Sequence, residues 1–272
     1  MCDICVMNSV KEKMLSRRDL FRASVATAAA ATVGSIVSAP PALADGHGGV
    51  VDMTHMFDET FPTWGGAPGI SYDKAFDFAK DGFNLYNLTI SEHSGTHIDA
   101  PLHFSADGQS VDEIPVGNLV CPLCVIDIAD RAEADADTQV TPDDISAWIA
   151  TNGDIPDGAC VAMHSGWSDK ARTDGFRNAD GDGTQHYPGF HIEATQMLLE
   201  TGAASIAVDT LSLDHGASQD FATHYAWLPA NRYGIECLAN LGSVPAAGAT
   251  LVVGAPKTGK GTGGPARIFA MV

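Results

Sequence analysis

Four side chains that can bind a metal or carry a proton lie within eleven residues of the sequence. They are His93, His97, Asp99 and His103, separated by four, two and four residues. A helix would place His93 and His97 on one face but would turn Asp99 far around it. In an extended chain all four have the same parity and point to one side. We therefore predict an extended segment, bent near Gly95 and Pro101, in which the four side chains converge.

This set of residues is typical of a catalytic metal site. Two imidazoles and one carboxylate commonly bind a divalent ion and leave positions open for water, so we predict that His93, His97 and Asp99 are ligands. Asp99 can bridge two ions if a second one binds. His103 is predicted to accept and donate protons, because histidine titrates near neutral pH. A single histidine in a strand is usually an ordinary polar residue, but four such residues of one parity favour a metal site.

The same segment resembles the signature of the metal-dependent cyclase family, which includes kynurenine formamidases (arylformamidases) and isatin hydrolases. The residues that carry the resemblance are His93-Ser-Gly-Thr-His97-Ile-Asp99-Ala-Pro101-Leu-His103. A second stretch, Val208-Asp209-Thr210-Leu-Ser212-Leu-Asp214, is similar to the family's Asp-Thr-x-Ser-x-Asp segment. Residues 159–167, which contain His164-Ser-Gly-Trp, resemble the strand ahead of the family's substrate loop. The resemblance covers roughly residues 50–272.

The resemblance implies further site residues and a cofactor. His224 and Glu236, twelve residues apart, match the remaining metal ligands of the formamidase branch, although each could instead be a buried polar residue with a hydrogen-bond partner. Asp209 and Asp214 are expected either to orient ligands from behind or to cap turns. The implied cofactor is a divalent metal, zinc or manganese, as one or two ions. The family also implies a homodimer.

Three aromatic residues are candidates for a substrate pocket. Phe61, Trp64 and Trp167 lie in segments of loop character, where their rings could stack on an aromatic substrate. A single large aromatic residue is more often part of the core, so this assignment competes with ordinary packing.

The activity that the resemblance implies is hydrolysis of a small aryl amide such as N-formylkynurenine, a reaction of tryptophan catabolism. The alternative is ring opening of a cyclic amide such as isatin, because the sequence around Glu236 looks closest to the isatin hydrolase branch, which has an amide at that position. Two other classes use similar ligands: a non-haem iron oxygenase and a non-catalytic periplasmic metal-binding protein. Oxygen consumption would identify the first, and turnover of an aryl amide would exclude the second.

Strands and helices alternate along the chain, which predicts an α/β fold. Hydrophobic patterns predict strands at residues 50–54, 84–90, 121–128, 159–163, 205–208, 233–238, 250–253 and 267–272. Capping residues predict helices at 141–150 and 192–200, and residues 167–188 are expected to form a long loop. The resemblance implies one cyclase-type domain at residues 45–272, with a mixed sheet and flanking helices of the swivelling β/β/α type.

The composition excludes several other classes. The chain has 272 residues, of which 45% are hydrophobic and 18% are charged, as in globular proteins. Its net charge of −19 repels phosphate backbones, so we expect a small-molecule substrate and no nucleic acid. Six cysteines are too few for a disulfide scaffold. Four of them lie in apolar runs, where buried thiols are favoured over a redox pair, and their pairing cannot be read: Cys121, Cys124, Cys160 and Cys237.

The N-terminal segment has the features of an export signal. Arg17 and Arg18 precede an apolar run at 23–39, and Ala42-Leu43-Ala44 resembles a cleavage site. We therefore predict a twin-arginine signal peptide at residues 1–44 and a periplasmic mature protein. The apolar run is too short and rich in alanine for a stable membrane span, so the mature form is expected off the membrane. The alternative is an amphipathic or buried N-terminal helix.

Replacing Arg17 and Arg18 together by lysine should keep the precursor in the cytoplasm, because the twin-arginine route reads the arginine pair. Immunoblots of periplasmic and cytoplasmic fractions measure this, with a periplasmic protein exported by the general secretory route as the control. An unchanged periplasmic yield would contradict the prediction.

Overall fold

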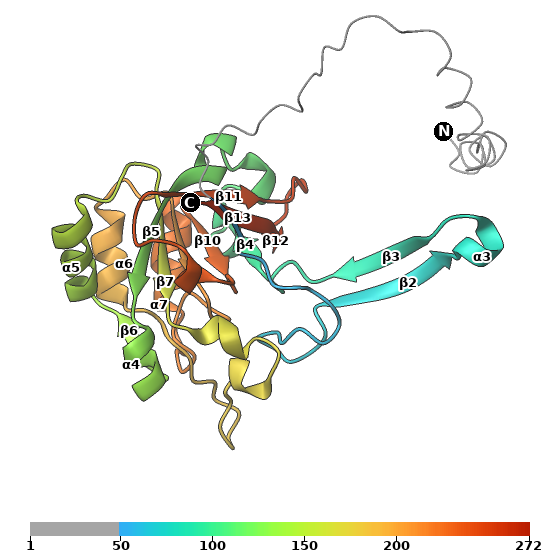
Figure 1. Cartoon of the computed structure of the whole chain (residues 1–272), viewed down its shortest axis with the longest axis horizontal. Coiled ribbons are helices and arrows are strands. Elements are labelled where there is room, and N and C mark those ends of the chain that lie inside the picture. Colours follow the sequence, from blue (N-terminus) through green and yellow to red (C-terminus); the bar gives the residue numbers. More distant parts are fainter. Residues whose placement is uncertain (1–48) are drawn as a thin grey trace, which may run out of the picture. The chain divides into compact units, whose positions relative to one another are not determined.

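The structure, a computed structural model, describes residues 49–272, so the predicted signal peptide at 1–44 lies outside the described residues. A nine-stranded mixed sheet forms its centre (Figure 1). In spatial order the strands are β1 (Val50–Asp52), β13 (Arg267–Met271), β11 (Ala249–Gly254), β5 (Val120–Asp127), β7 (Cys160–His164), β9 (Ser205–Val208), β10 (Tyr233–Glu236), β4 (His97–Asp99) and β12 (Gly263–Pro265). The middle strands β5, β7, β9 and β10 are parallel, and the outer strands pair antiparallel.

The central strands are buried on both faces, because alternate residues enter two different cores. Leu123 and Ala162 pack on one side, in a core shared with β4, β10, β11 and β13. Cys124 and Val161 pack on the other side, beneath the helices. The sheet therefore closes over one core and carries a helical layer on its other face.

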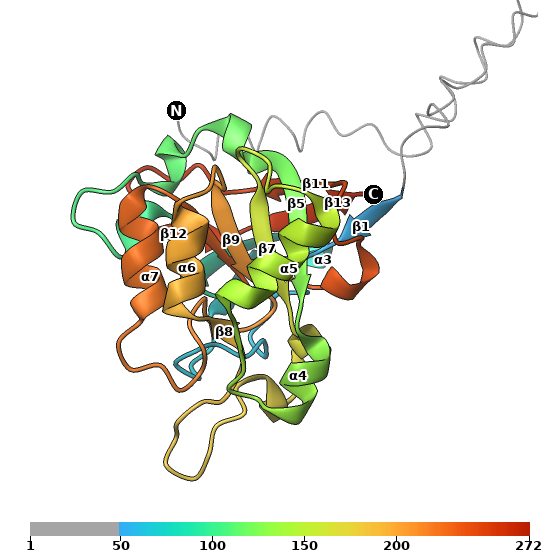
Figure 2. The same cartoon turned by 90° about the vertical axis from the view of Figure 1, so that its left-hand side faces the viewer.

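Three helices form that layer: α5 (Pro142–Asn152), α6 (Ile192–Leu199) and α7 (Ala222–Trp227). Figure 2 shows them over β7 and β9, with α6 in contact with both α5 and α7. The start of α5 follows the predicted cap, because the Thr141 backbone N–H and hydroxyl both donate to Asp144 Oδ2, at 2.8 and 2.9 Å. A short α4 (Ala129–Ala134) precedes two strands that pair in parallel, β6 (Gln139–Val140) and β8 (Gly189–Phe190).

Residues 73–87 separate as a small compact unit from the rest of the described chain. Here β2 (Ile70–Phe76) and β3 (Leu85–Ile90) form a two-stranded sheet, and α3 (Phe78–Asp81) lies between them in the sequence. Every residue of β3 is exposed, including Leu85 and Leu88.

The predicted α/β class with a mixed sheet is confirmed, and each predicted strand and helix has a counterpart. The expected loop at 167–188 is irregular apart from two short 3-10 helices, Trp167–Lys170 and Asp174–Phe176, and a strand-like contact before β8. The short strand β12 and the helix α7 were not predicted, because neither shows a clear hydrophobic period. Within residues 49–272, no helix has the length and apolar character needed to cross a membrane.

Candidate metal centre

The pairing of β4 with its neighbours brings two predicted ligands together. Glu236 of β10 lies directly opposite His97 in the antiparallel register, so their side chains share one face of the sheet. Asp99 lies opposite two glycines, Gly234 on β10 and Gly263 on β12. A Cβ atom at Gly263 would come within 2.8 Å of His93 Cε1, so glycine leaves space for that imidazole.

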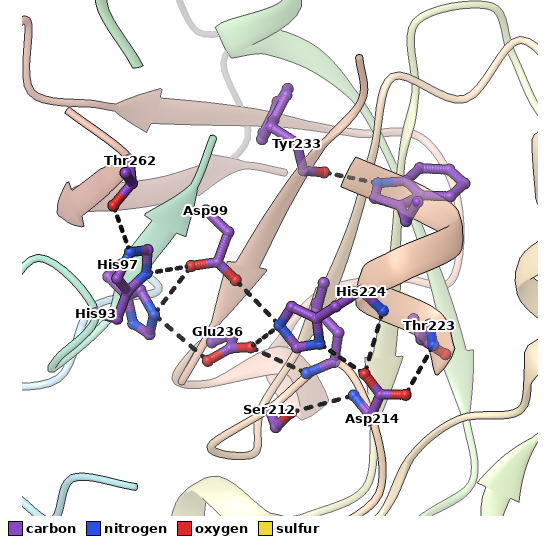
Figure 3. A network of polar contacts seen from close by, with 12 residues as sticks. His93, His97, Asp99, Ser212, Asp214, Thr223, His224, Tyr233, Glu236 and Thr262 are labelled. Carbon is purple, nitrogen blue, oxygen red and sulfur yellow. Dashed lines mark hydrogen bonds and ion pairs between the residues drawn. The ribbon is translucent and has the colours of Figure 1, made fainter. Parts of the chain in front are cut away.

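All three predicted histidine ligands direct a nitrogen at the carboxylates of Asp99 and Glu236 (Figure 3). His93 Nδ1 lies 2.7 Å from Asp99 Oδ1. His97 Nε2 lies 3.3 Å from Asp99 Oδ1 and 3.4 Å from Glu236 Oε2. His224 Nε2 lies 3.2 Å from Glu236 Oε1 and 3.6 Å from Asp99 Oδ2. The five predicted ligands therefore converge on one point.

The opposite ring nitrogens determine which tautomer each histidine adopts. His97 Nδ1–H donates to the Gly95 carbonyl at 2.9 Å, and His224 Nδ1–H donates to Asp214 Oδ2 at 2.6 Å. The Thr262 hydroxyl donates to Glu92 at 2.6 Å, so it accepts a hydrogen bond from His93 Nε2–H at 2.9 Å. The inward-facing nitrogen of each ring is therefore the one that can bind a metal once it has released any proton, which is the arrangement of metal-binding histidines.

The lone pair of an imidazole nitrogen repels the carboxylate that it faces unless a cation lies between them. His97 Nε2 and Asp99 Oδ2 are buried and have no hydrogen-bond partner within residues 49–272, so the residues present fit a metal ion. Two groups have the spacing of metal ligands, His93–Asp99–His103 and His97–Asp99–Glu236, and Asp99 belongs to both. Whether Asp99 bridges two ions when two bind therefore stays a prediction.

The pKa values of His97 and Glu236 also indicate that this cluster favours bound positive charge. Burial lowers the pKa of His97, but the Asp99 carboxylate outweighs burial and holds that pKa well above its usual value. Burial and then the charge of Asp99 raise the pKa of Glu236. Protons therefore bind this cluster when no metal does, and metal binding must release them.

Asp214 and Asp209, predicted as a pair, have different roles. Asp214 accepts hydrogen bonds from the backbone N–H groups of Thr223 and His224 and from the His224 ring, so it both caps α7 and orients a ligand. Asp209 instead accepts from the Ser165 hydroxyl and from two backbone N–H groups, those of Ser165 and Trp167. The prediction that Asp209 orients a ligand is therefore wrong, because its carboxylate holds the turn after β7.

The backbone that brings His103 to the cluster differs from the extended segment that was predicted. The bend at Gly95 is present, with φ of +67°, but the extended segment ends at Asp99 and Pro101–His103 forms a 3-10 turn. This turn stacks the His103 ring on the His93 ring, with 3.6 Å between ring centroids. Burial lowers the pKa of His103 to about 4, so the imidazole is neutral at pH 7.

A cavity of about 440 Å³ opens beside the cluster, a size suited to a small molecule. His93, His97, His103, His224 and Glu236 line its polar side. Its aromatic side includes Trp64, Phe104 and Phe221, of which only Trp64 was predicted. Phe104 directly follows His103 and Phe221 precedes His224 by three residues, but neither has a distinguishing sequence pattern.

Phe61 and Trp167 are core residues, which corrects the prediction that they line the pocket. Their exposed fractions are 2% and 1%, and both pack with Phe176 in a small separate core. The Trp167 indole N–H donates to the Phe176 carbonyl at 2.8 Å, which satisfies its polar group inside the protein.

Two functional partners were missed in the sequence. Glu92 and Thr262 together fix the tautomer of His93. Glu92 directly precedes the histidine, which is a weak signal, whereas Thr262 has none.

Comparisons with known proteins agree with this fold and site. Residues 51–215 match the family model described as "Putative cyclase". Isatin hydrolase from Roseibium aggregatum is 35% identical over 217 residues, which cover 75% of this chain and 82% of that protein. Isatin hydrolase A from Ralstonia solanacearum has a similar structure, with a TM-score of 0.78 and 32% identity over 90% of this chain and 100% of that one. A kynurenine formamidase from Geobacillus thermodenitrificans is 33% identical over 34% of this chain and 45% of that protein.

The chain belongs to the cyclase family. The relatives that cover most of it are hydrolases, and its own residues form a site that fits a metal ion. The predicted class, a metal-dependent amidohydrolase, is therefore confirmed.

Asp214→Asn should weaken metal binding about 10- to 100-fold, because the carboxylate that holds the His224 tautomer is lost. Competition with a chromophoric chelator measures the affinity. Asp209→Asn removes the same charge five residues earlier in the same segment, yet it should leave the affinity near that of the wild type. Equal losses in two variants with native circular dichroism would contradict the assignment.

Proposed function

We propose that this protein hydrolyses a small aryl amide, with ring opening of a cyclic amide such as isatin as the leading reaction. The observation that carries the proposal is the convergence of three imidazole nitrogens and two carboxylates beside an aromatic cavity. The isatin hydrolase match supports the cyclic substrate, because it extends over 75% of the chain, whereas the formamidase match extends over 34%.

N-formylkynurenine, the substrate first expected from the sequence, is the second candidate. The observation that favours it is the carboxylate of Glu236, which lies among the ligands at 3.2 Å from His224 Nε2. The formamidase branch has a carboxylate at this position, and the isatin hydrolase branch has an amide.

The chemistry that a bound divalent metal supplies is Lewis-acid activation of water and of the amide carbonyl. His103 is neutral and lines the cavity, so it can take a proton from the attacking water. As the carbon–oxygen bond forms and the carbon–nitrogen bond breaks, His103 returns that proton to the departing nitrogen. An aniline-type nitrogen leaves more readily than an alkyl amine, which favours aryl amides.

We infer zinc or manganese as the metal, because imidazole ligands suit zinc and carboxylate ligands suit manganese. We also infer export to the periplasm, from the predicted twin-arginine signal, and a homodimer, as the family resemblance implies. A monomer mass by sedimentation equilibrium would contradict the dimer.

His103→Ala should retain most of the metal and lose about 10²- to 10⁴-fold in turnover, the usual effect of removing a positioned proton carrier. Metal analysis together with kcat measures the two effects separately. His191→Ala, which removes a partly buried histidine whose ring caps α6 away from the cavity, should change neither. If metal and activity fall in proportion, His103 is a metal ligand instead.

The substrate is decided by following the absorbance of isatin and of N-formylkynurenine with equal amounts of metal-loaded enzyme. We expect isatin to react faster, because the more extensive sequence match is to an enzyme of that name. A rate at least tenfold higher with N-formylkynurenine would assign the protein to the formamidase branch. Turnover of neither compound, with metal bound, would refute both proposed substrates.

A further inference from the structure

We propose that Arg177 and Gln185 position Trp64 and thereby determine how strongly the reaction cavity prefers an aromatic ring. This inference rests on the proposed function, since it concerns the same cavity. Both residues belong to the 167–188 loop and neither lines the reaction cavity, so they act through Trp64 and not on the substrate.

Trp64 has little packing of its own to hold it. It belongs to a segment rich in glycine and proline, residues 62–69, and it is 51% exposed. Its indole lines the reaction cavity and faces Phe221 at 6.1 Å between ring centroids. A second cavity, of about 270 Å³, shares Thr63 and Ala67 with the first. Residues 62–69 therefore form a thin wall between the two cavities.

Two hydrogen bonds from the loop converge on the backbone of this wall. Gln185 Nε2 donates to the Trp64 carbonyl at 2.9 Å, and Arg177 Nη2 donates to the same oxygen at 3.2 Å. A carbonyl oxygen accepts two such bonds, so this one is saturated. The carbonyl is next to the Trp64 Cα atom, so its position determines how far the indole reaches over the cavity.

The two donors are specific to this contact. The Gln185 side chain is only 7% exposed, and its Oε1 has no hydrogen-bond partner within residues 49–272, so the bond to Trp64 accounts for its burial. Arg177 forms no ion pair with a carboxylate of the described chain. Its guanidinium packs on Gly66, whose φ is +77° and where a Cβ atom would lie 2.9 Å from Arg177 Nη1.

Arg172 provides a matched contrast in the same loop. It also lines the second cavity, but its guanidinium bonds to Asp58 and to the Met56 carbonyl. It therefore supports the segment before Trp64 without touching Trp64 itself. Replacing Arg172 removes one arginine from the same surface and leaves the Trp64 carbonyl bonded.

The test measures binding of benzamide and of cyclohexanecarboxamide, which differ in aromaticity but not in ring size, by calorimetry with metal-loaded protein. The wild type should prefer benzamide, and Arg177→Met with Gln185→Leu should reduce that preference about 3- to 10-fold, the value of one lost aromatic stacking contact. Arg172→Met should keep the preference. Arg177→Lys keeps a donor where Arg177→Met removes it, so this variant should keep most of the preference for benzamide.

The proposal is overturned if the wild type shows no preference, if neither amide binds, or if Arg172→Met and the double variant lose the preference equally. Thermal melting and metal content are measured for every variant, and both should match the wild type. Binding is measured without turnover, so the preference can be interpreted even if the protein hydrolyses neither proposed substrate. Conversely, an enzyme that opens isatin but fails this test keeps its proposed function and loses only the role of the loop.

Discussion

The burial of two carboxylates at one point is the constraint on which the rest of this structure depends. Asp99 and Glu236 are both almost fully buried, and both face His97 Nε2. Buried carboxylates are costly unless a cation and hydrogen bonds compensate them. Here the outer hydrogen bonds of His97 and His224 direct their other ring nitrogens inward, so the surrounding chain prepares a place for a cation, which protons fill when no metal is bound.

The sheet supplies the precision that such a site requires. Strand β4 lies between β10 and β12, and its register fixes His97 against Glu236 and Asp99 against two glycines. The fifth ligand, His224, is on a helix, and Asp214 ties the start of that helix to the segment after β9. Four of the five predicted ligands are thus held by regular elements, which position side chains more exactly than loops do, and His93 lies in the bend just before β4.

This division explains what could be predicted from the sequence. The spacing of His93, His97 and Asp99 is local, so strand parity was enough to group them. Glu236 depends on strand pairing across the sheet, which no local pattern shows, and only the resemblance pointed to it. Hydrophobicity alone could not separate Trp64, which lines the cavity, from Phe61, which lies in a core.

The same reasoning applies to Asp209 and Asp214, which lie five residues apart in one segment. Their roles differ because the chain brings Ser165 to one carboxylate and His224 to the other. Such differences arise from tertiary contacts, which are also where this chain can diverge from its relatives. Four of the five predicted ligands lie on strands or a helix and His93 lies in the bend just before β4, whereas Trp64 lies on a thin segment held by a long loop. The two hydrogen bonds from that loop end at the Trp64 carbonyl and not at a predicted ligand, so the role that we propose for the loop concerns the shape of the cavity and not the metal centre.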